Sequence, residues 1–319
     1  MKKAMLSFLC VCVLFAAAGL GEAADFPGKK PITIVVPYSA GGASDTTARI
    51  FAAEMEKVLG TSFIVTNITG ASGAIGLEHA RSRKPDGYTL AYMPVESTML
   101  RALGFTDLSC ADFKFICRVM TIPATVTVRA DSEWKTFEDL LAYAKAQPEK
   151  IQTGNSGTGS IWHVAAASLE EASGAKFTHV PFEGAAPAVA ALVGKNIQMV
   201  TVSPSEVKSN VDSGELKILA VLGEARSSVF PDVKTARELG VDLALQAWGG
   251  FAVPKGTPED VVKILEDAAK TAANSEALKK LLKERGFDHA YLSGDEMDKR
   301  AAAELEHFGN LIPKLGIAN

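Results

Sequence analysis

Residues 32–45, with the sequence ITIVVPYSAGGASD, combine the features of an anion-binding site. The apolar stretch 32–36 predicts a buried strand, and Ser44 and Asp45 begin a predicted helix. A small-residue loop with a glycine pair separates the two. A strand that leads through such a loop into a helix N-terminus gathers unpaired backbone N–H groups and the positive end of the helix dipole at one point. We therefore expect this segment to bind an anion, either a carboxylate or a phosphate.

The same combination of residues recurs along the chain. Small-residue loops also precede predicted helices at residues 70–74, 156–160 and 183–187, and Ser203 caps a further helix. In an open α/β sheet, such loops line the crevice at the carboxyl ends of the strands. Each helix dipole contributes roughly 0.3–1 kcal/mol to anion binding, so several that converge would hold a small carboxylate without an arginine. One such loop is an ordinary strand–helix turn, but their recurrence predicts a binding site.

Most catalytic chemistries lack the residues that they need. The segment 154–160 is glycine-rich like a phosphate loop, but no lysine follows Gly159. No G-x-G-x-x-G follows the first strand, and no G-x-S-x-G nucleophile elbow is present. The five histidines are scattered without a metal-binding pattern. Neither a metal nor another cofactor is expected.

One catalytic alternative stays open at this loop. Ser156 or Ser160 could act as a nucleophile with His163 as its base, in an exported hydrolase or transferase. His163 follows one turn inside the next predicted helix. We favour a structural role for it, in which it bonds neighbouring loops, and we predict a protein that is not an enzyme.

Residues 1–23 have the composition of a secretory signal peptide. Lys2 and Lys3 give a basic start, residues 4–20 are apolar, and small residues precede an expected cleavage after Ala23 or Ala24. A retained membrane anchor is the alternative, but the apolar run is short for a bilayer and no lipidation-type cysteine motif follows it. We therefore expect export to the periplasm.

Charge and composition exclude several classes of partner. The chain has 37 acidic and 33 basic residues, a formal net charge of −4, and no basic cluster that would bind nucleic acid. No second long apolar span follows the signal segment, so the mature protein is expected to be soluble. Cys110 and Cys117 remain in the mature chain, and their spacing allows either a disulfide or two separate thiols.

Apolar runs alternate with amphipathic helical patterns through most of the chain, which predicts α/β layers. Residues 32–93 follow a βαβαβ pattern with short loops, and a second α/β set runs from residue 124 to about 222. After an extended segment at 247–253, only helices are expected, and they return to pack on the first lobe. We predict two lobes, each a doubly wound mixed sheet, joined by two crossover segments, with residues 24–123 and 247–319 in lobe one and 124–246 in lobe two.

Several longer motifs occur in order along the chain. They include PITIVVPYSAGGASDTTAR at 31–49, SGTGSIWH at 156–163 and HVPFEGAAPA at 179–188. The motif N-x-x-G-A-S-G-A-I-G lies at 67–76, and VPKGTP lies at 253–258. Through their order and spacing, the chain resembles the periplasmic solute-binding proteins of tripartite tricarboxylate transporters, the TctC or Bug family.

The resemblance implies an α/β, two-lobed periplasmic-binding-protein fold of type II that closes around its ligand. It implies capture of a small organic carboxylate, and delivery to a membrane permease of one large and one small subunit. We expect a monomer, and a ligand-gated sensor component that binds a receptor is an alternative. The predicted ligand-binding residues are Tyr38, Ser39, Gly42, Ala43, Ser44, Asp45, Gly73, Ala74, Pro94, Ser156, Gly157, Thr158, Gly159, His163, Phe182, Glu183, Gly184, Val202, Ser203 and Trp248.

The sequence departs from the family's pattern in two places. Where Glu, Arg and Pro usually surround the Asn of the second loop, this chain has Thr66, Ile68 and Thr69. Where the fourth strand of lobe two often ends in an aspartate, it has Val202. An aspartate there would suit an amino group. Its absence therefore favours a di- or tricarboxylate, or an aromatic carboxylate stacked near Trp248, over an amino acid.

Overall fold

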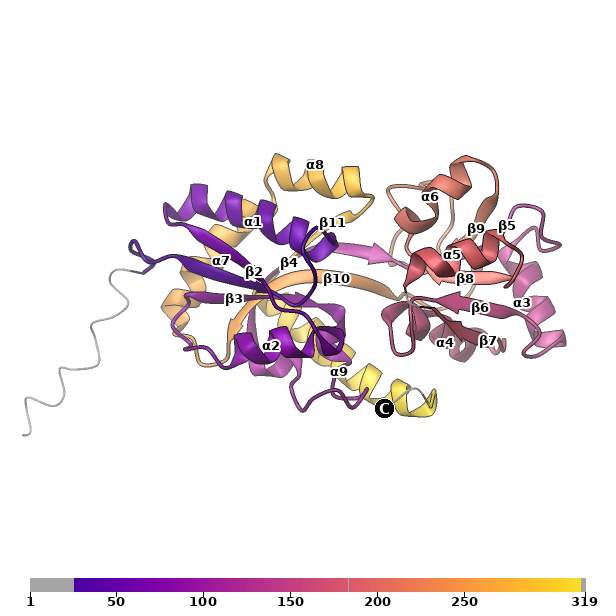
Figure 1. Ribbon diagram of the computed structural model, residues 1–319, viewed down its shortest axis with the longest axis horizontal. Helices are drawn as coiled ribbons and strands as arrows, with labels where there is room; N and C mark the ends of the chain where they lie inside the picture. Colours follow the sequence, from indigo (N-terminus) through magenta and orange to yellow (C-terminus); the bar gives the residue numbers. More distant parts are fainter. Residues whose placement is uncertain (1–25, 183, 317–319) are drawn as a thin grey trace, which may run out of the picture.

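The protein folds into two α/β lobes that lie side by side, each built around its own sheet (Figure 1). The computed structural model describes residues 26–182 and 184–316. The predicted signal peptide, residues 1–23, and the predicted ligand residue Glu183 lie outside these described residues. We call the lobe around the six-stranded sheet lobe one, and the lobe around the five-stranded sheet lobe two. The predicted mixed α/β fold class is confirmed.

Lobe one is built from two separate stretches of the chain. Its strands are β1 (Ile32–Val36), β2 (Phe63–Asn67), β3 (Thr89–Pro94), β4 (Phe113–Pro123), β10 (Gln246–Pro254) and β11 (Asp288–Ser293). Its helices are α1 (Ala43–Leu59), α2 (Ala74–Arg81), α7 (Glu259–Ala273), α8 (Glu276–Arg285) and α9 (Gly294–Lys314). Short 3-10 turns are η2 (Ala71–Gly73), η3 (Val95–Thr98) and η4 (Cys110–Asp112).

The sheet of lobe one has the order β11-β4-β10-β3-β1-β2. Strands β1, β2 and β3 are parallel, as the βαβαβ pattern predicts, whereas β10 runs antiparallel to both β3 and β4. Helix α1 buries its apolar stripe on this sheet, where Phe51 stacks on Phe251 of β10 with ring centroids 3.8 Å apart. This packing fixes the N-terminus of α1 at the carboxyl end of β1.

Lobe two is formed by one continuous stretch of the chain. Its strands are β5 (Thr125–Arg129), β6 (Gln152–Asn155), β7 (Thr178–Pro181), β8 (Met199–Val202) and β9 (Leu216–Val221), in the order β7-β6-β8-β5-β9. Its helices are α3 (Phe137–Ala146), α4 (Ile161–Ser173), α5 (Ala185–Val193) and α6 (Pro204–Asp212), and η5 (Arg237–Leu239) is a 3-10 turn. The predicted cap at Ser203 is confirmed, and it forms a capping box with Glu206 at the start of α6, as Thr136 and Asp139 do at the start of α3.

Two crossings join the lobes, one from β4 to β5 and one from residue 222 to β10. The backbone of Ala124 connects them. Its N–H donates to the carbonyl of Leu245 over 3.4 Å, and its carbonyl accepts from the N–H of Leu222 over 2.8 Å. The end of α9 also reaches lobe two, where Lys314 Nζ lies 3.6 Å from Glu171 (Figure 1).

The prediction of helices alone after residue 253 was wrong, because β11 forms the edge of the six-stranded sheet. All six of its residues are only partly buried. Its pairing with β4 is also interrupted by an irregularity between His289 and Leu292. A short edge strand of this kind lacks the regular in–out alternation by which a strand is predicted from sequence. Helices α7 and α9 both contact β4 of lobe one.

Cys110 and Cys117 are two separate thiols, so the structure decides between the alternatives that their spacing allowed. Both are buried in lobe one. Burial, followed by nearby carboxylates, raises the pKa of Cys110 to about 12, and burial also raises the pKa of Cys117. Neither thiol is poised to ionise or react.

Candidate functional site

The loop from Tyr38 to Asp45 leads from the end of β1 into α1, as predicted. Gly41 has φ +83°, a left-handed conformation that glycine adopts without strain. Gly42 is the N-cap of α1, and no side chain hydrogen-bonds to the helix end there. Ser39 and Gly42 are exposed, and Ala43 and Ser44 are partly exposed. The first-turn N–H groups of α1 therefore face outward without a side-chain partner.

Asp45 points into lobe one and organises this loop. Its carboxylate accepts hydrogen bonds from the Gly41 N–H at 2.8 Å, from Arg49 Nε at 3.0 Å and from Asn67 Nδ2 at 3.0 Å. Burial opposes its ionisation, but these hydrogen bonds outweigh burial and hold the pKa of Asp45 below its usual value. With only 2% of the residue exposed, the carboxylate has no surface left for a ligand.

Arg49 and Asn67 are therefore parts of the site that sequence reasoning missed. Arg49 Nη2 lies 3.1 Å from Asn67 Oδ1, and Asn67 Nδ2 also donates to the carbonyl of Tyr38 over 2.9 Å. The arginine charge is neutralised by Asp45, so it adds little positive potential to the loop. The i, i+4 spacing of Asp45 and Arg49 was a usable signal for this pair.

Tyr38 lies at the carboxyl end of β1, next to the end of the parallel strand β3. Its hydroxyl donates to the carbonyl of Ser72 over 3.4 Å and lies close to Gly73. Burial, and then the adjacent Glu96 carboxylate, raises the pKa of Tyr38. Glu96 belongs to η3 and follows Pro94 by two positions, and sequence reasoning missed it. Its position directly after a strand that ends at the crevice could have identified it from the sequence.

Lobe two presents the matching loop, residues 156–160, between β6 and α4. Asn155 Oδ1 accepts from the Gly157 N–H over 3.0 Å, and Ser160 Oγ accepts from the His163 N–H over 3.2 Å. Gly157 and Gly159 have φ values of +126° and +75°, which explains the glycines of this motif. Ser156 and Gly157 are partly exposed and Thr158 is exposed, so this loop also presents polar groups at the surface.

His163 holds the loop in place. Its Nδ1 accepts a hydrogen bond from the Gly159 N–H over 3.1 Å. Burial, and then the neighbouring His179, lowers the pKa of His163 to about 4, so the ring is neutral at physiological pH. His179 in turn lies 3.4 Å from Glu170. The structure therefore gives His163 the loop-bonding role that the sequence suggested.

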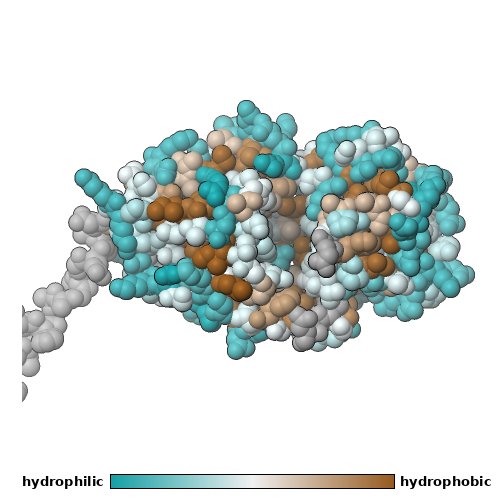
Figure 2. Space-filling model, viewed as in Figure 1, coloured by the Kyte–Doolittle hydropathy of each residue, from teal (hydrophilic) through white to brown (hydrophobic). Residues whose placement is uncertain are grey.

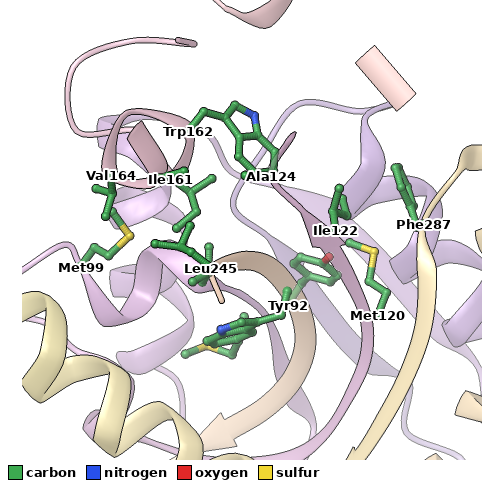
Figure 3. Close-up of a cluster of buried hydrophobic side chains, with 14 of the residues drawn as sticks. Tyr92, Met99, Met120, Ile122, Ala124, Ile161, Trp162, Val164, Leu245 and Phe287 are labelled. Atoms are coloured by element: carbon green, nitrogen blue, oxygen red, sulfur yellow. The ribbon is translucent and has the colours of Figure 1, made fainter. Parts of the chain in front are cut away.

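The N-terminal end of α1 and the carboxyl end of β6 both point toward the region between the lobes (Figure 1), where the surface is indented (Figure 2). A Cβ atom on Gly159 would lie 2.8 Å from Leu103 of lobe one, so the lobes already touch here. Nearby, Met99 of lobe one lies beside Ile161 and Val164 of α4 (Figure 3). The segment that follows η3 therefore packs against the N-terminal end of α4.

The remaining predicted residues differ in their access to this indentation. Gly73, Ala74 and Pro94 are buried at the ends of their elements in lobe one. Phe182 and Gly184 are partly exposed, and the Phe182 N–H donates to the carbonyl of Asn155 over 3.1 Å. A further pair, Val202 and Ser203, is buried where β8 leads into α6.

Trp248, predicted as a ligand residue, lies in the interior of lobe one. It is 2% exposed, and its indole N–H donates to Glu304 of α9 over 2.6 Å. Its ring also meets Phe115 edge to face, with centroids 5.9 Å apart. The proposed aromatic wall at Trp248 is therefore corrected to a core position, because β10 crosses the middle of the sheet beneath α9.

In the part of the chain that the structure describes, no group of three or more His, Cys, Asp or Glu side chains is placed to hold a metal ion. No helix among residues 26–182 and 184–316 is long and apolar enough to cross a membrane.

Comparison with known proteins agrees with this architecture. The family described as tripartite tricarboxylate transporter family receptor matches residues 47–317. A UPF0065 protein from the gbd 5′ region of Cupriavidus necator is 32% identical over 96% of this chain and 93% of its own length. The crystal structure of a TctC solute-binding protein from Polaromonas has a TM-score of 0.84 and 39% identity, and the match covers 91% of this chain and 99% of that one.

Two similar structures carry ligands. A Rhodopseudomonas palustris protein with bound malate has a TM-score of 0.70 and 26% identity, covering 90% of this chain and 100% of that one. An R. palustris protein with adipate has a TM-score of 0.74 and 26% identity, covering 92% of this chain and 99% of that one. The family match and the coverage of these relatives extend over both lobes. The chain belongs to the tripartite tricarboxylate transporter receptor family, the TctC or Bug solute-binding proteins.

Proposed function

We propose that this protein captures a small organic carboxylate between its two lobes and delivers it to a tripartite tricarboxylate-type permease. The observation that carries this proposal is the pairing of two loops at helix N-termini, residues 38–45 and 156–160, on facing lobes. Relatives with bound malate and adipate support a carboxylate as the ligand. The partner is a membrane permease of one large and one small subunit, and the route to it is export through the signal segment 1–23.

The carboxylate is held by groups that the fold leaves available. In lobe one these are the N–H groups at the start of α1 together with the Ser39 and Ser44 hydroxyls, since Asp45 is occupied by its own network. In lobe two the N–H groups of Gly157 and Gly159 already have partners. Ser156 and Thr158 are therefore the residues of that loop that contact the ligand.

Because each lobe supplies one of the two ligand-binding loops, ligand binding should bring the lobes together. A ligand that bonds to both loops interacts more strongly with the closed form than with the open one, and so shifts the population toward closure. The hydrogen-bonded crossings at Ala124 and Leu245 are the positions about which the lobes rotate. Lobe two, which begins with β5, then moves as one body against lobe one.

The geometry disfavours the hydrolase alternative. A Ser–His pair requires the imidazole to accept a hydrogen bond from the serine hydroxyl. Here His163 Nδ1 accepts from the Gly159 N–H, and Ser160 Oγ accepts from the backbone of His163. Ester and amide substrates should therefore show no turnover, and the Ser156→Ala variant should change carboxylate binding only.

Calorimetric titration of ligand-stripped protein with a carboxylate panel tests the proposal. We expect saturable binding of at least one acid, and a smaller radius of gyration in solution scattering at saturation. Thr158→Ala should weaken that binding about 10-fold, whereas the exposed Thr178→Ala, outside the loop, should leave it unchanged. Absence of binding and of thermal stabilisation with every acid would overturn the proposal.

A further inference from the structure

The carboxyl group of Glu96 is an unexpected feature of a carboxylate-binding surface. Glu96 lies in η3, immediately after β3, and β3 is the parallel neighbour of β1 in the sheet. The loop that starts α1 follows β1, so both segments emerge at the same edge of the sheet. The side chain of Glu96 lies beside the Tyr38 phenol, at the beginning of the proposed anion loop.

The chain segment that follows Glu96 contacts lobe two. Its residues Met99 and Leu103 meet Ile161 and Gly159 at the start of α4 (Figure 3). The 3-10 turn η3 contacts η2, which contains Ser72 and Gly73 of the loop after β2. Glu96 is therefore located among the segments of lobe one that border the interlobe indentation, and it retains partial exposure.

Within the described residues, Glu96 has no ion-pair partner among the Lys, Arg and His side chains. Arg49 is the basic residue closest in sequence to the anion-binding loop 38–45, and it already donates hydrogen bonds to Asp45 and Asn67. Burial raises the pKa of Glu96, the expected result for a carboxyl group without a compensating charge. A ligand with a hydroxyl or ammonium donor would give Glu96 a hydrogen-bond partner in addition to the neighbouring Tyr38 phenol.

We propose that Glu96 accepts a hydrogen bond from a hydroxyl or ammonium group of the ligand, and so selects carboxylic acids that carry such a donor close to the bound carboxylate. This inference rests on the proposed function, because it assigns the part of the ligand next to the captured carboxylate. A plain hydrocarbon or a second carboxylate at this position would leave Glu96 desolvated, with only the Tyr38 phenol beside it. A site that contains a polar group for a ligand donor rejects the analogue that lacks that donor.

Matched ligand series test this assignment. Succinate, malate and aspartate differ only by hydrogen, hydroxyl or ammonium at one carbon, and glutarate, 2-hydroxyglutarate and glutamate form a second series. Calorimetry on ligand-stripped protein should give an affinity at least 10-fold higher for a donor-bearing member than for its plain parent. Mass spectrometry of any acid released from the denatured, freshly purified protein should find a hydroxyl or amino acid.

Two variants separate the role of Glu96 from a general effect on the fold. Glu96→Leu removes both acceptor oxygens of the side chain. It should reduce the affinity ratio between a donor-bearing acid and its plain parent to below about 3-fold. Glu96→Gln keeps one acceptor oxygen without the charge, so it should abolish a preference for ammonium and retain part of a preference for hydroxyl. Glu306→Gln, at an exposed position on α9, is the matched control and should change nothing.

The outcomes distinguish this inference from the proposed function. Equal or tighter binding of the plain parents, or an unchanged preference in a folded Glu96→Leu variant, would overturn the role of Glu96 while carboxylate capture stands. A released acid without hydroxyl or amino groups would have the same consequence. Failure of both series and of the wider panel to bind would overturn capture itself, and this inference with it.

Discussion

His163 Nδ1 accepts a hydrogen bond from the backbone N–H of Gly159 over 3.1 Å, which ties the first turn of α4 to the loop that precedes it. The bond requires a neutral imidazole, because a protonated ring has no acceptor nitrogen. Burial, followed by the charge of the neighbouring His179, lowers the pKa of His163 to about 4 and so keeps the imidazole neutral. The shape of the loop is therefore linked to the ionisation of a buried histidine.

Stability should consequently fall as pH decreases from about 6.5 toward 4. In this window the unfolded state binds a proton at position 163 that the folded state does not, so the free energy of unfolding rises with pH. The contribution of His163 to the free energy of unfolding is fully present above the ordinary histidine pKa. About 2 kcal/mol of this contribution is lost between pH 7 and pH 5. Urea unfolding at the two pH values measures it.

His163→Asn should remove this pH dependence, since its amide oxygen can accept the Gly159 N–H without titrating. His307→Asn, at an exposed position on α9, is the control and should retain the slope of the parent protein. If the unfolding free energy of the His163→Asn variant changed with pH as steeply as that of the parent protein, another group would be responsible for the pH dependence.

Replacement of Asp45 by asparagine should destabilise lobe one. The variant leaves Arg49 without its charged partner and weakens three hydrogen bonds in a buried position, which costs about 1–3 kcal/mol. Because the folded pKa of Asp45 is depressed, its contribution is present above pH about 4 and is lost as pH falls through the folded value. The acid limb of the stability profile should therefore become shallower.

The matched control for this change is Asp212→Asn. Asp212 pairs with Lys208 at the same i, i+4 spacing, but both side chains are more than half exposed. An exposed pair contributes only about 0.3–0.5 kcal/mol. Similar losses of unfolding free energy in the two variants would refute a special role for the Asp45 network.

Gly159→Ala should weaken ligand binding more than it weakens the fold. Gly159 and Gly174 have nearly the same φ, +75° and +74°, so alanine is strained at both, by about 1 kcal/mol. Only at Gly159 does the new Cβ meet another lobe, 2.8 Å from Leu103. We expect equal unfolding free energies for the two variants within about 1 kcal/mol, but at least a 10-fold loss of carboxylate affinity for Gly159→Ala alone.

A second substitution locates the cause of that loss. Leu103→Ala in the Gly159→Ala background frees the space and should recover most of the affinity, as measured by calorimetry. A double variant that binds no better than Gly159→Ala would mean that loop strain, and not the contact between lobes, controls the site.

The thiols of Cys110 and Cys117 should stay unreactive in the native protein and titrate as two free thiols once it is unfolded. Burial removes access and raises both pKa values, so the thiolate fraction at pH 8 is very small. A chromogenic disulfide reagent with and without denaturant measures this in protein that lacks residues 1–23. Absence of reactive thiols in denaturant would indicate a disulfide.

The sequence by itself predicted the parts of this protein that depend on short-range chemistry. Gly41, Gly157 and Gly159 have the positive φ angles that small-residue loops before helices require. The helix cap at Ser203 also forms as expected, in a capping box with Glu206. These features could be predicted because each depends on residues within a few positions of one another.

Tertiary structure decided which side chains share a site. Asn67 joins Asp45, and Glu96 joins Tyr38, only because β1 pairs with β2 and β3 from distant parts of the chain. Trp248 becomes a core residue because β10 returns between β3 and β4. Strand pairing brings residues that are tens of positions apart in the sequence into contact. Local sequence patterns do not indicate which distant strands will pair. The loops of the site were therefore predictable, whereas their partners required the folded chain.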